Sequence, residues 1–169
     1  MARRIEHRSR STWDAKTVYK ALVDPAYLRD RLAAIGGKGA ELVNRRSTAD
    51  QVEFQLRHGV AAGDLPAAVR TLLGGDLTID RRETWRPGPD GGYVGTVEVT
   101  IPGMPGDLSG TQLLRDLDGG GSELVVDGTV RVSIPLFGGK IEESVTDQIS
   151  KLLDSEHEFT QEWLGRHDS

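Results

Sequence analysis

Two histidines stand where an imidazole could take part in acid–base chemistry or hold a ligand. His7 and His58 each fall on the predicted inward face of a strand. In an apolar cavity an imidazole can transfer a proton or bind a polar group of a ligand. The alternative is a structural role, as a core histidine with satisfied nitrogens or as a histidine at the end of the sheet. Because no acidic partner or third metal ligand lies at a diagnostic spacing, the sequence favours the structural role, with the functional role as the alternative.

A second group of candidates consists of charged residues on predicted inward faces. Arg81 and Glu83 alternate with apolar residues on one strand, and Arg115 is expected to face the same side from a later strand. With Glu156 they would form a buried network that orients the polar head of a ligand or shifts the pKa of a general acid or base. The alternative is a structural ion-pair network near the rim, or a bulge that turns these side chains to solvent. The predicted ligand-binding set is therefore His7, His58, Arg81, Glu83, Tyr93, Arg115 and Glu156.

Glu156 is the best placed of these candidates, because it interrupts the apolar stripe of a long predicted helix from Gly138 to Leu164. At about 100° per residue the stripe is ~140° wide, which suits a helix packed on a core. Its members are Ile141, Val145, Ile149, Leu152, Leu153, Phe159, Trp163 and Leu164. A carboxylate near the middle of this stripe is costly unless it is paired or hydrated. The sequence therefore predicts an internal cavity or a partner at this position.

Before this helix the sequence predicts one strand, two short helices and six further strands. The first strand covers 4–12, and the helices cover 15–22 and 26–35, with Asp14 and Asp24 as N-caps and Pro25 at the start of the second. A short helix capped by Asp64 is expected over 64–75. The further strands are expected over 40–47, 51–60, 77–85, 93–101, 109–117 and 123–134.

These elements fit a single α+β domain over residues 1–169. Successive strands joined by short turns should pair antiparallel, giving a sheet of about seven strands. One face of that sheet alternates to charged residues and can stay in water, whereas the other is apolar. The long helix carries the complementary apolar stripe, so the sheet is expected to curve around it.

Composition excludes several classes of function. The chain has no cysteine and neither an HxH nor an HExxH motif, so we expect no disulfide, thiolate catalysis, metal site or cofactor. A net charge of −5 argues against non-specific binding to nucleic acid. No apolar run approaches the roughly 20 residues of a membrane span, and the N-terminus lacks the apolar stretch of a signal peptide. We therefore expect a cytoplasmic protein, and the sequence leaves its oligomeric state open.

The order of elements resembles the START-like, or SRPBCC, superfamily and its helix-grip fold. The resemblance rests on the strand Ile5-Glu6-His7-Arg8-Ser9, the Asp14 cap, the Asp24-Pro25 break and the helix from Ile141 to Leu164. Within the superfamily, the segment from Asp64 to Gly75 and the run Glu83-Thr84-Trp85 resemble an uncharacterised bacterial family of about this length. The resemblance implies a hydrophobic small molecule held between sheet and terminal helix. Superfamily members include enzymes, carriers and sensors, so the fold alone does not choose among them.

Three functions are compatible with this sequence. We expect first a binding module for a lipid-like or aromatic small molecule. The alternative is a cyclase- or dehydratase-type enzyme that uses Glu156 or a cavity histidine as its acid–base group. The third is an interaction protein whose interior is filled by its own side chains. The identity of a ligand cannot be derived from the sequence.

Overall fold

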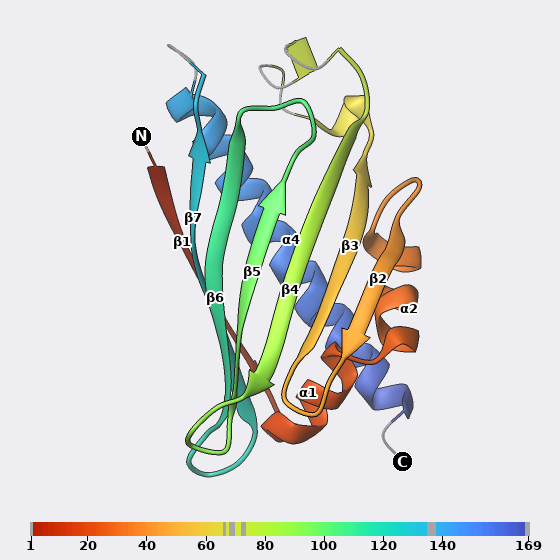
Figure 1. Cartoon of the computed structure of the whole chain (residues 1–169), viewed down its shortest axis with the longest axis vertical. Coiled ribbons are helices and arrows are strands. Elements are labelled where there is room, and N and C mark those ends of the chain that lie inside the picture. Colours follow the sequence, from red (N-terminus) through yellow and green to blue (C-terminus); the bar gives the residue numbers. More distant parts are fainter. Residues whose placement is uncertain (1, 66, 68–69, 72–73, 135–137, 168–169) are drawn as a thin grey trace.

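A computed structural model describes residues 2–65, 67, 70–71, 74–134 and 138–167. Seven strands form one antiparallel sheet in the order β1-β7-β6-β5-β4-β3-β2 (Figure 1). The strands are β1 (Ala2–Ser11), β2 (Glu41–Ser47), β3 (Val52–Val60), β4 (Leu77–Pro87), β5 (Tyr93–Thr100), β6 (Gly106–Asp116) and β7 (Ser122–Val132). The helices are α1 (Ala15–Leu22), α2 (Pro25–Ile35) and α4 (Gly138–His167), with a 3₁₀ turn η1 (Ala62–Asp64) after β3.

Both short helices start at the predicted caps. The Asp14 carboxylate accepts a hydrogen bond from the backbone N–H of Thr17 at 2.8 Å, and Asp24 accepts one from Ala26 at 2.7 Å. Pro25 is the first residue of α2, where the missing N–H costs nothing. These local contacts separate α1 from α2 and let the second helix pack beside β2.

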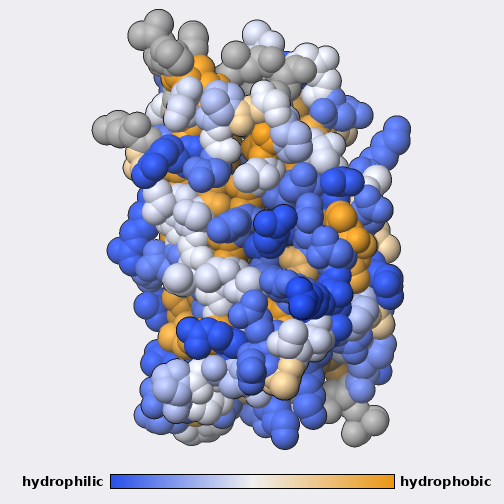
Figure 2. All heavy atoms as spheres, in the orientation of Figure 1, coloured by the Kyte–Doolittle hydropathy of each residue, from blue (hydrophilic) through white to orange (hydrophobic). Residues whose placement is uncertain are grey.

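The sheet has an inner and an outer face that follow the alternation of each strand. On β3 the side chains of Val52, Phe54, Leu56 and His58 are buried, and each intervening residue is more exposed. The outer face, which is turned to the viewer in Figure 2, carries mostly hydrophilic residues. The inner face is covered by α4, which runs diagonally behind the strands (Figure 1).

The long helix closes the interior from one end of the sheet to the other. Its apolar stripe is buried at both ends, through Ile141 near the start and Trp163 and Leu164 near the finish. It packs against β1 and β7 and, at its C-terminal end, against α1 and α2. The predicted helix-grip fold, a curved antiparallel sheet around a long C-terminal helix with two short helices after the first strand, is confirmed.

One predicted element falls mostly outside the described part of the chain. Of the short helix expected over 64–75, residues 66, 68–69 and 72–73 are not among the described residues. Asp64 is the last residue of η1, and residues 67, 70 and 71 are helical. Within the described ranges, no helix combines the length and the apolar character needed to span a membrane.

Candidate functional site

A cavity of about 250 Å³ lies between the inner face of the sheet and the N-terminal half of α4. Every strand except β2 contributes to its wall, and most of the lining is aliphatic. The apolar lining residues are Ile5, Val60, Leu65, Leu77, Ile79, Val97, Val99, Ile101, Met104, Leu108, Val126, Val145, Ile149, Leu152 and Leu153. We call this space the large cavity. Its walls suit an apolar molecule, because they offer few polar partners.

Four buried charged residues form a cluster at one end of the large cavity. Arg81 on β4 donates from Nη1 to Glu156 Oε2 at 2.7 Å, and its Nε lies 3.0 Å from Glu83 Oε2. Arg31 on α2 approaches the same Glu156 oxygen with Nε at 3.6 Å. We call these four residues, all buried, the charged cluster. Its two guanidinium groups and two carboxylates balance, so its net charge is zero.

The positions of these residues follow from strand and helix geometry. Arg81 and Glu83 are two residues apart on β4 and therefore share its inner face. Glu156 projects from the apolar stripe of α4 onto this face, as the helical register predicts. The prediction that Arg81, Glu83 and Glu156 form a buried network is met by the observed contacts.

The charges of the cluster fix its protonation state. Burial alone would raise the pKa of Glu156, but the positive charges of Arg31 and Arg81 outweigh it and lower the pKa to about 2. Burial would likewise lower the pKa of Arg81, and the neighbouring carboxylates of Glu156 and Glu83 raise it instead. The Glu156–Arg81 contact is therefore an ion pair at any pH near neutrality.

Polar residues that the sequence analysis did not select complete the surroundings of the cluster. Gln112 on β6 donates to Glu83 Oε1 at 2.8 Å. Tyr27 Oη lies 2.5 Å from Thr160 Oγ1 and accepts a longer hydrogen bond, 3.4 Å, from Arg31 Nη1. Arg31, Gln112, Tyr27 and Thr160 are all buried. One sequence signal for Arg31 was available, because it lies three residues after Leu28 and four before Ile35 on the inward side of α2.

His58 enters the large cavity from β3, between the inward-facing Leu56 and Val60. Only 5% of its surface is exposed, and its Nε2 has no hydrogen-bond partner among the described residues. Burial, supported by the nearby charge of Arg81, lowers the pKa of this imidazole to about 4. The histidine is therefore neutral at physiological pH.

Among the predicted site residues, His58 and Arg81 line the large cavity, whereas His7, Glu83, Tyr93, Arg115 and Glu156 do not. His7 lines a smaller, more polar cavity of about 50 Å³ on the other side of the charged cluster. Its Nε2 lies 2.7 Å from Asp154 Oδ1 on α4, so it has a partner. Tyr93 stacks on Tyr19 of α1 with 3.9 Å between ring centroids, and it lines neither of these two cavities.

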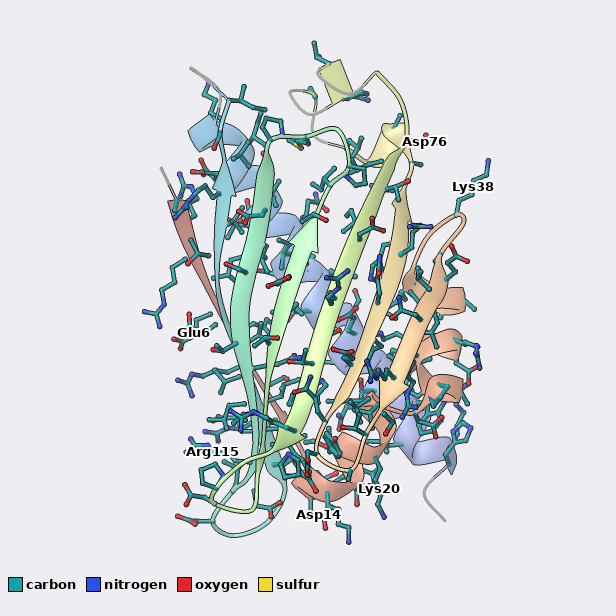
Figure 3. The ribbon with its side chains drawn as sticks, in the orientation of Figure 1. Glu6, Asp14, Lys20, Lys38, Asp76 and Arg115 are labelled. Atoms are coloured by element: carbon teal, nitrogen blue, oxygen red, sulfur yellow. The ribbon has the colours of Figure 1, made fainter. Side chains whose placement is uncertain are left out.

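The predicted inward orientation of Arg115 is wrong. Its guanidinium lies on the outer face of β6, half exposed, and donates to Glu123 at 3.2 Å (Figure 3). The next residue towards the N-terminus, Leu114, is buried opposite the partly buried Tyr93 of β5. Because paired residues of antiparallel strands share a face, Leu114 faces inward and Arg115 must face outward.

The described residues offer little that would hold a metal ion. Within those residues, no three His, Asp or Glu side chains are grouped as a metal site requires. The charged cluster instead pairs its carboxylates with guanidinium groups. What the site provides is an apolar space, a charge-balanced set of buried ion pairs and one buried imidazole whose Nε2 has no hydrogen-bond partner among the described residues.

Comparison with known sequences places the chain in a defined group. Residues 6–164 match the family described as "Protein of unknown function (DUF2505)". An uncharacterized protein of Mycobacterium tuberculosis strain H37Rv is 32% identical over 153 residues, which make up 87% of this chain and 88% of the relative. An uncharacterized protein of Mycobacterium bovis matches with the same identity and coverage.

Comparison with solved structures identifies the fold. The Zhui aromatase/cyclase from Streptomyces sp. R1128 superimposes with a TM-score of 0.66 at 15% identity, over 100% of this chain and 97% of that chain. Human STARD10 gives a TM-score of 0.62 at 14% identity, over 97% of this chain and 66% of that chain. Norcoclaurine synthase from Thalictrum flavum gives 0.56 at 12% identity, over 100% and 98%. At these identities the likeness shows the helix-grip fold alone.

Proposed function

The chain belongs to the DUF2505 family, and we propose that it binds a hydrophobic small molecule in the large cavity. The observation that carries this proposal is the cavity itself, about 250 Å³ of space with aliphatic walls between sheet and α4. Structural relatives include an aromatase/cyclase and a norcoclaurine synthase point mutant in complex with a transition-state analogue, and these precedents support small-molecule binding by this fold.

The size of the cavity favours an occupant over an interior filled by the protein itself. Its aliphatic walls lack the van der Waals contacts that a close-packed interior would provide. A ligand that fills the space restores the lost contacts, so binding would stabilise the folded protein.

The contacts of Glu156 argue against its use as an acid–base catalyst. A general acid or base works best when its pKa lies near the operating pH. The two guanidinium groups hold the pKa of Glu156 at about 2, and its carboxylate is already paired. A cavity histidine remains the acid–base candidate of the cyclase- or dehydratase-type alternative. Turnover of a bound compound by the native protein, lost in H58L, would favour that alternative.

The proposal is tested by titrating the purified protein with N-phenyl-1-naphthylamine, a neutral dye whose fluorescence rises in apolar surroundings. V99F should weaken binding at least about fivefold, because Val99 lines the large cavity and a phenyl ring would fill part of it. E98F is the matched control, since Glu98 is the neighbouring, exposed residue on the outer face of β5. It should bind the dye as the native protein does.

Thermal melts give a second readout. A saturating ligand at one hundred times its Kd should stabilise the native protein by about 2.7 kcal/mol. Absence of dye binding, or equal binding by native protein and V99F, would contradict the proposal. Native mass spectrometry of the protein from its expression host would then show whether another compound occupies the cavity.

A further inference from the structure

Among the described residues that line the large cavity, His58 is the one buried polar side chain with neither a hydrogen bond nor an ion pair. Four side chains with polar ends line the cavity: His58, Arg81, Gln112 and Gln148. Arg81 is paired with Glu156 and Glu83, Gln112 donates to Glu83, and Gln148 is exposed on α4. His58 Nε2 is buried and has no hydrogen-bond partner among the described residues. A buried polar group without a partner costs free energy, which a suitably placed ligand would recover.

The strand geometry places the side chain of His58 on the wall of the cavity. His58 pairs with Ile79 of β4, and both side chains line the large cavity. The imidazole is neutral, because burial and the charge of Arg81 depress its pKa to about 4. A neutral imidazole has one N–H donor and one acceptor nitrogen, and the tautomer decides which role Nε2 plays. A hydroxyl group can pair with either tautomer, and a carbonyl group can accept from the N–H form.

The electrostatics of the site exclude a preference for a charged ligand. Arg31 and Arg81 balance Glu83 and Glu156, and the carboxylate of Glu156 is held ionised. An anion or cation entering the cavity would lose its hydration and find no unmatched opposite charge. Apart from His58, Arg81, Gln112 and Gln148, the lining of the large cavity is apolar.

We propose that His58 Nε2 is the hydrogen-bonding anchor of the cavity, and that its ligands are neutral, mainly apolar molecules carrying one hydroxyl or carbonyl group. This inference rests on the proposed function and specifies its ligand class. The volume of about 250 Å³ exceeds that of the roughly 150 Å³ engineered cavity that holds benzene, so a body of about two fused rings fits.

Three probes of one shape test the inference: naphthalene, 2-naphthol and 2-naphthoate. Binding is measured by fluorescence, directly for 2-naphthol and by displacement of 2-naphthol for the other two. The variant H58L removes the nitrogen and keeps an apolar side chain, and H58F offers a planar ring if H58L does not fold. The control R57A alters the residue directly before His58 on β3. The side chain of Arg57 pairs with Asp80 and Glu41 outside the cavity.

The decisive quantity is the Kd of naphthalene divided by the Kd of 2-naphthol. Loss of one neutral hydrogen bond should reduce this ratio about fivefold to tenfold in H58L or H58F. R57A should leave it unchanged, and naphthalene itself should bind both histidine variants as well as it binds the native protein. The native protein should bind 2-naphthoate more weakly than 2-naphthol.

The outcomes separate this inference from the proposed function. If naphthalene and 2-naphthol bind the native protein and the ratio survives in both histidine variants, His58 is not the anchor, and cavity binding still stands. If 2-naphthoate binds most tightly, the neutral ligand class is wrong. If none of the probes binds and N-phenyl-1-naphthylamine also fails, the proposed function falls, and the inference falls with it.

Discussion

Replacing Glu156 with leucine would remove the carboxylate that holds two buried arginines together. In E156L, Arg81 keeps Glu83 at 3.0 Å. Arg31 loses the contact of its Nε with Glu156 and keeps the 3.4 Å hydrogen bond from Nη1 to Tyr27. The net charge of the cluster changes from zero to +1 in an interior where all of these side chains are buried.

The expected cost is large because a charge is left without its counter-ion. Removing one partner of a buried ion pair typically costs about 3–5 kcal/mol. For a chain of this length each kcal/mol lowers Tm by about 2–4 °C, so E156L should melt ~6–20 °C below the native protein. Urea denaturation followed by circular dichroism gives the free energy of unfolding independently of Tm.

A double variant distinguishes loss of charge balance from loss of a well-packed side chain. R31L/E156L removes one charge of each sign and leaves the Arg81–Glu83 pair, so the cluster is neutral again. It should be at least about 2 kcal/mol more stable than E156L, because apolar groups can replace a buried ion pair at little cost. E158L, at an exposed position of the same helix, should change stability by less than about 0.5 kcal/mol. The reasoning is refuted if E156L melts as high as the native protein, or if the double variant is no more stable than E156L.

Three further predictions test the fold, the orientation of β3 and β4, and the charge state of His58. Deleting the chain from Gly139 onward should abolish the cooperative melt, because eight apolar side chains of the helix each contribute roughly 1.5–3 kcal/mol when buried; a soluble, cooperatively melting fragment would contradict this. R81A should lose dye binding more than R57A, checked by titration beside a melt of each variant, and equal losses would show that the assignment of faces is wrong. Lowering the pH from 6.5 to 4 should reduce the free energy of unfolding of the native protein by up to about 3 kcal/mol more than that of H58L. The reason is that the pKa of the histidine is about 6.5 in the unfolded chain and about 4 in the folded protein, so the unfolded chain takes up the proton first. The same pH profile in both proteins would rule out a buried neutral His58.

Features with a local cause were predictable from the sequence. The caps Asp14 and Asp24 act on backbone groups two or three residues away, so they need no knowledge of the fold. The alternation of β3 and β4 is unbroken over several residues, which identified the inner face and with it His58 and Arg81. The register of α4 is determined by an apolar stripe of many turns, and it placed Glu156 correctly.

The errors and omissions arose where two elements must be placed relative to each other. The adjacent leucines Leu113 and Leu114 fit either face of β6, and only the pairing with β5 shows that Leu114 and Gln112 face inward. Arg31 lies on the inward side of α2, but its partner is more than a hundred residues away on α4. The contact between His7 and Asp154 likewise joins the two ends of the chain. Such pairs depend on how the sheet curves around α4, which no local pattern specifies.

The location of the charged cluster explains why this interior is divided. Arg81 of the cluster and its neighbour Gln112 line both the large and the small cavity, so the cluster stands between the apolar core packed around α1 and α2 and the one that lines the large cavity. Leucines in its place could join the two cores at little cost in stability, because buried ion pairs seldom contribute more than well-packed apolar residues. What apolar residues could not provide is a charge-balanced polar wall at one end of the large cavity. If His58 is the anchor proposed above, a ligand in the large cavity would meet the charge-balanced cluster at one end and the His58 imidazole beside it, and a single hydrogen bond would set the orientation of the ligand.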